Sequence, residues 1–386
     1  MPQPIYLDHA ATTPVRPEVV DAMQPFFGPR FGNPSSVHRW GREARAALDE
    51  ARERLAACVG ASADEVCFTS GGTESDNLAL LGTWRARRST RNAVVTAPIE
   101  HKAVLAAIHQ VAKEGGEERL LAVDRAGIVL PDSFNECVRD DTALCSVMWI
   151  NNEIGVVQDV PRLAAVAHER GVFFHTDAVQ AFGKVSIDAK AVPFDALSLS
   201  GHKIGAPKGI GAMFIRRGSA IEPLMHGGSQ DRGRRPGTEN VAMSVALATA
   251  AELAVAEREA ECARLTALRE KLETALLARI PDAVVHGFGA PRAPHIVNIS
   301  VPGTDSESLL MALDLQGVAC SAGSACQSGS VTPSHVLSAI GVRRDLAAAA
   351  IRMSLGSLST EADIDRVAQL FPSLVEKARR LTGAHA

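Results

Sequence analysis

The sequence predicts an α/β protein, with a large domain built on a mostly parallel sheet and a smaller α+β domain. Three observations lead to this class. The chain has 386 residues, more than one ordinary domain. Short apolar segments typical of strands alternate with helical stretches over its first two thirds. Hydrophobic residues make up 46% and aromatic residues only 4%, which favours Ala-rich helices packed on a sheet. We place the large domain at residues 15–257 and the small domain at residues 1–14 and 258–386.

Bulk composition excludes several classes of protein. The formal net charge of -4 argues against a nucleic-acid-binding surface. The seven cysteines are odd in number and include no C-x-x-C pair, which argues against a disulfide framework and for the reducing cytoplasm. The sequence has neither a signal-peptide pattern nor an apolar run of about 20 residues, so we expect no membrane span. We expect no metal site.

The first glycine-rich turn predicts a phosphate site. Residues 5–14 form a short extended segment that stops at a proline, and residues 41–59 have helical spacing. A strand at residues 65–69 then leads into glycines, Thr73 and a new helix. Free N–H groups and the positive end of the helix dipole would face an anion there, and Gly72 lets the backbone come close. The alternative is an ordinary capped helix after a strand.

Polar side chains follow the next predicted strands at residues 93–96, 144–150 and 172–180. His101 and Asn152 come after the first two of these strands, at the rim where α/β proteins bind ligands. Asp177 stands near the tip of the third, where a buried carboxylate needs a partner. That partner is either a nearby Arg or Lys or a protonated ring nitrogen. His101 is alternatively a capping residue, and Asn152 a plain turn residue.

The strand at residues 194–199 ends in a small-residue turn that presents His202 and Lys203 side by side. Loss of solvation at the end of a buried strand lowers the pKa of a lysine. Its neutral amine is then a nucleophile able to form a Schiff base. The alternative is a surface lysine in a Gly-rich loop, which the rest of the chain argues against.

The remaining elements complete the two domains. After a strand at residues 209–215, the basic Gly-rich loop 226–238 is suited to an anion or a neighbouring subunit, or is simply a mobile solvated loop. One long helix is predicted from residue 239 to residue 279. The smaller domain is predicted to have strands at residues 296–300 and 351–355, and helices at residues 306–315, 333–340 and 361–380.

One cysteine is a candidate nucleophile. Cys326 lies among small residues in the segment 317–330, without bulky neighbours in sequence, so its thiol can reach a partner. Cys320 lies at an apolar, strand-like end and is a weaker candidate. The other cysteines of the first 150 residues are interpreted as core residues; they are Cys58, Cys67, Cys137 and Cys145.

Together these residues match the chemical needs of pyridoxal phosphate. Its aldehyde needs Lys203, its ring nitrogen needs Asp177, and one face of its ring can stack on His101. Its phosphate needs hydroxyl groups, an imidazole and backbone N–H groups, for which the candidates are Thr73, Ser200 and His202.

The chain resembles the cysteine desulfurases of the NifS/IscS type, in the class V aminotransferase family. These belong to the fold-type I, aspartate-aminotransferase-like enzymes that use pyridoxal phosphate. Ten runs spread over nearly the whole chain carry the resemblance: YLD (6–8), ATTP (11–14), FGNP (31–34), TSG (69–71), TESDN (73–77), EHKAV (100–104), NNEIGV (151–156), SGHK (200–203), GSAC (323–326) and IRMSLG (351–356).

The resemblance implies a set of cofactor contacts. Pyridoxal phosphate is expected to be covalently bound to Lys203, paired with Asp177 and stacked on His101, which also serves as an acid or base. Gln180 approaches the ring hydroxyl group. Thr238 reaches the phosphate of the other subunit, so a homodimer is expected.

The resemblance also implies the reaction. Asn152 and Arg352 hold the carboxylate of L-cysteine, which suits the guanidinium fork of arginine. The Cys326 thiolate attacks the substrate sulfur, giving L-alanine and a persulfide on Cys326. That sulfur is expected to pass to an acceptor, such as an iron–sulfur scaffold or a thiolation system.

Some features depart from the family pattern. Gln327 replaces the usual Thr after the cysteine, and Gly205 followed by Ala206 stands where a Tyr-Gly pair is common. The chain ends soon after its last predicted helix, without the tail that docks the scaffold in longer relatives, so the acceptor stays open. Three alternatives also stay open: a selenocysteine lyase, an aminotransferase or other lyase using pyridoxal phosphate, and a non-catalytic sulfur-carrier partner.

Overall fold

The computed structural model describes residues 3–322 and 333–382 of the chain. Its larger sheet has seven strands, and the four pairings that β3, β4, β5, β6 and β7 make with one another are all parallel. Only β8 runs against its neighbours. The predicted α/β class with a mostly parallel sheet is confirmed. In spatial order the strands are β2 (Val66–Thr69), β8 (Gly211–Ile215), β7 (Ala196–Ser200), β6 (Phe173–Asp177), β5 (Thr142–Ser146), β3 (Ala93–Thr96) and β4 (Glu117–Leu120).

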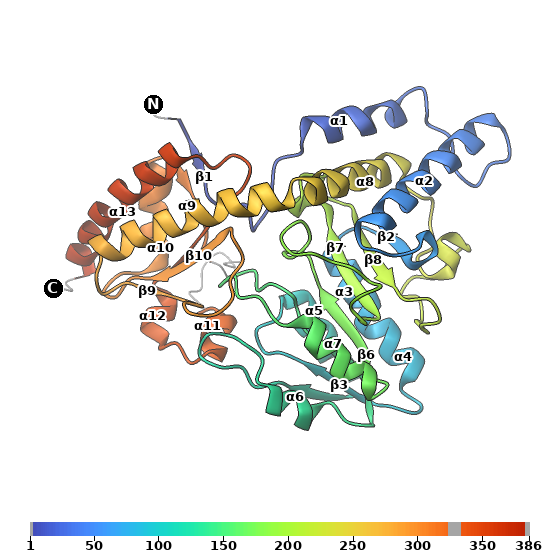
Figure 1. The fold of residues 1–386 in the computed structure, drawn as a ribbon, viewed down its shortest axis with the longest axis horizontal. Helices are drawn as coiled ribbons and strands as arrows, with labels where there is room; N and C mark the ends of the chain where they lie inside the picture. The colour runs from blue at the N-terminus through green and yellow to red at the C-terminus, as the bar shows by residue number, and fades with distance from the viewer. Residues whose placement is uncertain (1–2, 323–332, 383–386) are drawn as a thin grey trace.

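Helices cover both faces of this sheet, as expected where parallel strands are buried on both sides (Figure 1). Alternate residues of one strand enter different cores: Phe173 packs in one apolar cluster and Phe174 in the other. The helices that contribute to the first cluster include α1 (Pro17–Met23), α2 (Arg39–Cys58), α7 (Val160–Glu169) and α8 (Val241–Ala256). The second is covered by α3 (Gly72–Asn77), the π-helical turn η3 (Leu78–Gly82), α4 (Thr83–Arg87) and α5 (Lys102–Lys113).

The parallel strands deliver their polar ends to one edge of the sheet. β6 ends at Asp177 and β7 at Ser200, directly before the turn that carries Lys203. The chain after β3 reaches the start of α5 at the same edge, and β2 leads into α3. Because carboxyl ends of parallel strands converge, these loops meet around one space.

A smaller sheet forms the other part of the molecule. It is antiparallel, in the order β12 (Ala350–Ser354), β10 (Ile296–Ser300) and β9 (Val284–Val285). A separate pair joins β1 (Ile5–Tyr6) in parallel to β11 (Val318–Ala319). A third apolar cluster includes residues of both ends of the chain. The helices of this part and its edge are α9 (Arg258–Arg279), α10 (Ser306–Leu315), α11 (His335–Ala339), α12 (Arg344–Ala348) and α13 (Glu361–Thr382). One further helix, α6 (Pro131–Cys137), belongs to the larger part.

The prediction of one helix from residue 239 to residue 279 is wrong. The chain forms two helices in line, α8 and α9, with a break at Glu257 (Figure 1). The Glu257 carboxylate binds the Arg16 guanidinium through two hydrogen bonds of 2.7 and 2.8 Å. The break supports our proposal that the large domain ends at residue 257 and that residues 1–14 and 258–386 make the small domain.

No helix within residues 3–322 and 333–382 combines the length and the apolar character that crossing a membrane requires.

Candidate active site

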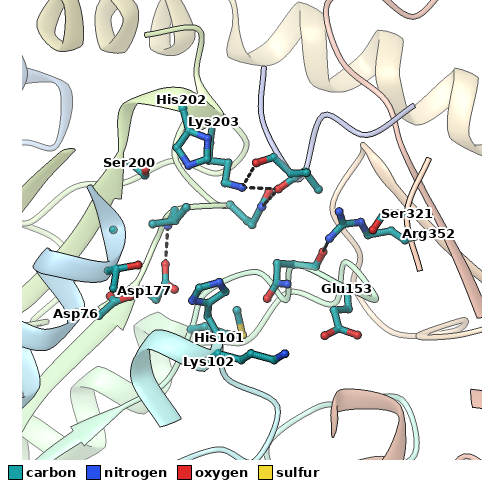
Figure 2. Close-up of a pocket in the computed structure, with 18 of the residues that line it drawn as sticks. Asp76, His101, Lys102, Glu153, Asp177, Ser200, His202, Lys203, Ser321 and Arg352 are labelled. Carbon is teal, nitrogen blue, oxygen red and sulfur yellow. Dashed lines mark hydrogen bonds between the residues drawn. The ribbon is translucent and has the colours of Figure 1, made fainter. Parts of the chain in front are cut away.

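A cavity of about 310 Å³ lies at the carboxyl edge of the larger sheet, facing the smaller sheet (Figure 2). It brings together the predicted site residues Gly72, Thr73, His101, Asn152, Asp177, Gln180, Ser200, His202, Lys203 and Arg352. Thr238 does not line it and is exposed on this chain. Cys326 lies outside the residues that the structure describes. Residues far apart in sequence thus share one space.

Lys203 lies in the turn after β7, and its ammonium group is held by backbone carbonyl groups. Nζ donates to the oxygens of Ala10 and Ala11 at 2.6 and 2.7 Å. Burial lowers the pKa of Lys203 to about 8; the charge of Arg352 adds to this, while Asp8 and Asp177 oppose it. A substantial fraction of this amine is therefore neutral, and nucleophilic, near neutral pH.

The lowered pKa predicts the pH dependence of aldehyde capture by Lys203. Only the neutral amine reacts, so in cofactor-free protein the rate should rise with pH around a midpoint near 8, well below the 10.5 of an ordinary lysine. The measurement is the initial rate of the absorbance change with pyridoxal phosphate between pH 6.5 and 10.5. The Lys203→Ala variant is the blank. A midpoint near 10 would show that the turn leaves this amine unperturbed.

Asp177 offers a buried carboxylate to the cavity. Its Oδ1 accepts a hydrogen bond from the backbone N–H of Val179 at 2.8 Å. Burial raises its pKa, and the neighbouring His101 and Lys203 oppose this rise. Ligand atoms of Asp76, His101 and Asp177 lie within 4.8 Å of one another. Burial raises the pKa of Asp76 well above its usual range, and the charge of Asp177 adds to this rise. Of the two carboxyl groups, Asp76 therefore ionises less readily, which favours the charged form on Asp177.

His101 caps the helix α5 and extends into the cavity. Its Nδ1 accepts from the backbone N–H of Ala103 at 3.2 Å, which places the ring proton on Nε2. Burial lowers the pKa of His101, with Lys203 adding to the effect and Asp177 opposing it. Figure 2 shows the His101 ring and Asp177 extending into the same space. A neutral imidazole here can stack on an aromatic ring and take up a proton.

The other end of the cavity is suited to an anion. The α3 helix starts at Gly72, so the N–H groups of its first turn lack helical partners. A Cβ at residue 72 would lie 2.8 Å from Val179 Cγ2 and 3.6 Å from Ser200 Cβ, so a side chain would fill this space. His202 Nδ1 lies 3.2 Å from Thr12 Oγ1, and burial lowers the His202 pKa to about 4. Hydroxyl and N–H donors thus surround a space that only glycine keeps open.

Arg352 enters the cavity from β12 of the smaller sheet. Its Nη2 binds Asp8 Oδ1 at 2.8 Å, and its Nη1 donates to the backbone oxygen of Asn152 at 2.8 Å. The buried Nε has no partner among the described residues. The guanidinium group therefore keeps donors for a substrate carboxylate. The contact of Arg352 with Asn152 uses the Asn152 backbone carbonyl group and not its amide side chain.

Sequence reasoning missed Asp8, which pairs with Arg352, and several lining residues of the cavity, namely Ala10, Ala11, Asp76, Lys102, Met148, Glu153, Val179, Ser321 and His335. The signal for two of the acids was present, because Asp8 and Asp76 lie in the runs YLD and TESDN. The carbonyl groups that hold Lys203 carried no signal, since any residue type supplies a backbone oxygen. The predicted extended segment 5–14 was therefore assigned no function.

Both flanks of the segment that carries Cys326 are fixed at the cavity. Ser321 and Arg352 pair through their backbones, with N–O distances of 3.1 and 2.6 Å. On the other side, the Ser334 hydroxyl group donates to the buried carboxylate of Glu153 and caps α11. Cys326 follows Ala322 by four residues, so a fully extended chain reaches about 14 Å. Chain length therefore permits Cys326 to approach the cavity.

Comparison with known proteins agrees with this geometry. The sequence pattern described as aminotransferase class-V matches residues 5–367. The chain belongs to the aminotransferase class-V family. Within this family it is 45% identical over 382 residues to "Cysteine desulfurase IscS" of Dictyoglomus turgidum, covering 99% of this chain and 97% of the relative. It is 44% identical over 379 residues to "Cysteine desulfurase NifS" of Azotobacter vinelandii, covering 98% and 94%.

A solved structure described as a NifS-like protein matches the class-V fold. The TM-score is 0.89 at 33% identity, over 99% of this chain and 100% of the other. The predicted fold-type I architecture and the resemblance to NifS/IscS-type cysteine desulfurases are confirmed. Enzymes of the class-V family generally use pyridoxal phosphate. The glycine-lined anion end, the buried Asp177 carboxylate and the Lys203 amine fit that group.

Proposed function

We propose that the protein is a cysteine desulfurase that converts L-cysteine to L-alanine and leaves the sulfur as a persulfide on Cys326. The observation that carries the proposal is the convergence of Lys203, Asp177, His101 and Arg352 on one cavity. Near-full-length similarity to cysteine desulfurases supports the same activity.

The residues of the cavity suggest how pyridoxal phosphate is held. Lys203 binds its aldehyde, Asp177 its ring nitrogen, and Gln180 its ring hydroxyl group. His101 covers one face of the ring. Its phosphate takes the donors at the anion end, from Gly72, Thr73, Ser200 and His202. When bound, the cofactor supplies an electron sink next to the substrate carbon atoms.

The chain's own residues perform the remaining tasks. Arg352 binds the substrate carboxylate through its remaining N–H donors and so orients the substrate in the cavity. Lys203 and the neutral His101 move protons to and from the substrate. The Cys326 thiolate forms the new S–S bond as the substrate C–S bond breaks. The electron pair of that bond stays with carbon, which is then protonated, so no external oxidant is needed.

Two finer proposals accompany this function. Thr238 is exposed on the single chain, at the end of the basic loop, which supports its reaching the phosphate of a second subunit in a homodimer. The persulfide sulfur passes to an acceptor protein, such as an iron–sulfur scaffold or a thiolation enzyme, in the cytoplasm.

The test is turnover of L-cysteine by the purified protein in the presence of a thiol reductant. We expect a yellow protein that forms alanine and sulfide in equal amounts. Parallel assays with L-selenocysteine separate the desulfurase from a selenocysteine lyase, since a lyase turns over only the selenium substrate. Transamination of alanine with a keto acid would support an aminotransferase. A protein that stays colourless with added pyridoxal phosphate would contradict the proposal and favour a carrier.

The anchor at Ser334 predicts a selective loss of activity. Replacing Ser334 with alanine removes the cap of α11 and leaves the Glu153 carboxylate buried without its hydroxyl partner. We expect about 1–2 kcal/mol lower unfolding free energy and roughly tenfold slower alanine formation, with cofactor affinity unchanged. Ser338→Ala on the exposed side of the same helix is the control. Equal effects of the two variants would show that the anchor does not position Cys326.

A further inference from the structure

His295 connects the smaller sheet to a residue of the cavity. It lies directly before β10, and only 4% of its surface is exposed. Its ring Nε2 lies 3.2 Å from Gln180 Oε1, on the loop after β6 of the larger sheet. His295 lines a second cavity, of about 460 Å³, and not the first one of about 310 Å³, whereas Gln180 and Lys203 line both. The hydrogen bond to Gln180 is therefore the contact that links His295 to the first cavity.

The hydrogen bonds around Gln180 fix the orientation of its amide. Gln180 Nε2 donates to the Ala10 carbonyl oxygen at 2.9 Å. A carbonyl oxygen only accepts, so the atom facing it is the NH₂ group and the atom facing His295 is the oxygen. His295 must then donate from Nε2. Burial holds the pKa of His295 well below its usual value, and its charged neighbours Lys184, Arg352 and Arg269 add to this effect. The ring is thus neutral, with its proton on Nε2.

This arrangement leaves the second N–H of Gln180 for the cavity. The Ala10 oxygen that accepts from Gln180 also accepts from Lys203 Nζ, so His295, Gln180, Ala10 and Lys203 form one continuous chain of hydrogen bonds. If His295 did not donate, the Gln180 oxygen would be left buried without a partner. The amide would then be held only by its hydrogen bond to Ala10, so the direction of its second N–H group would be less well fixed.

We propose that His295 is a positioning residue that keeps an N–H group of Gln180 directed at the cofactor held by Lys203. It touches neither substrate nor cofactor. Because the inference rests on the proposed function, its test uses cofactor affinity rather than turnover. If the wild-type protein binds no pyridoxal phosphate, the proposed function fails; if it binds, the His295 variants decide the inference on its own.

The experiment is a double-mutant cycle in cofactor-free protein. We measure the dissociation constant of pyridoxal phosphate by absorbance for the wild type, His295→Ala, Gln180→Ala and the double variant. Loss of one hydrogen bond predicts about fivefold weaker binding for each single variant. The double variant should bind no more weakly than Gln180→Ala, since His295 acts only through that residue.

A second pair of variants separates hydrogen bonding from packing. His295→Gln places a donor close to the position of Nε2 and should restore wild-type affinity, whereas His295→Leu fills the space without a donor and should behave like His295→Ala. The proposal is overturned if the losses of cofactor affinity seen in the two single variants multiply in the double variant. It is also overturned if His295→Leu restores affinity as well as His295→Gln does. If His295→Ala does not fold, the comparison of glutamine with leucine decides alone.

Discussion

Replacing Lys203 with alanine is expected to lower alanine formation from L-cysteine by at least about 10³-fold. Lys203 is both the nucleophilic amine and a group that moves protons, so the variant loses two functions at once. Proton transfer alone contributes about 10²–10⁴-fold. The variant should also lose the covalent, reducible link to pyridoxal phosphate, while the other cofactor contacts remain. The measurements are the rate of alanine formation and the mass of the protein after borohydride treatment.

Lys208 provides the matched control for this prediction. It lies five residues further along the same loop and is exposed. Lys208→Ala should keep wild-type activity and the cofactor mass adduct. If Lys203→Ala still carried a borohydride-stable adduct, another lysine would hold the cofactor. The assignment of the site would then be wrong, although the fold would be unaffected.

Replacing Cys326 with alanine is expected to reduce persulfide formation on the protein to background. Alanine production should fall on the order of 10³-fold, as when a covalent nucleophile is lost. The cavity residues are untouched, so the yellow colour and the affinity for pyridoxal phosphate should stay. The measurements are the amounts of alanine and sulfide, and the mass increase of roughly 32 daltons that one extra sulfur atom gives the intact protein.

Two other cysteines serve as controls for Cys326. Burial raises the pKa of Cys320 to about 12 and that of Cys58 to about 11, so both thiols stay protonated at neutral pH. Cys320→Ala and Cys58→Ala should form the persulfide at the wild-type rate. Loss of the persulfide in Cys320→Ala, with retention in Cys326→Ala, would move the sulfur acceptor to Cys320.

The sequence allowed the fold and the cavity to be predicted because one physical rule links them. Strands at residues 65–69, 93–96 and 296–300 were recognisable as apolar runs, and β3 and β10 have the predicted bounds. Parallel strands converge at their carboxyl ends, so polar residues placed after them, such as Asp177 and Lys203, had to meet. Local pattern and global topology agree in this part of the chain.

The remaining features depend on contacts that no local pattern encodes. The exposed edge strand β4 and the helix break at Glu257 follow from tertiary contacts, the latter from Arg16, 241 residues away. The same holds for the pairing of Asp8 with Arg352 and for the bond between His295 and Gln180. In each case the residue type is unremarkable where it stands in sequence, and only folding gives it a partner.

The acceptors of Lys203 have a consequence for the timing of assembly in the cell. The Ala10 carbonyl that binds Lys203 is held in place through the Ala10 N–H, which donates to Ser354 Oγ at 2.9 Å. Ser354 is synthesised 151 residues after Lys203 (354 minus 203), a delay of roughly 8–30 seconds at typical translation rates. The nascent chain therefore exposes its reactive lysine well before the surroundings that tune it exist. Stable capture of the cofactor is a late event, which follows the synthesis of Ser354.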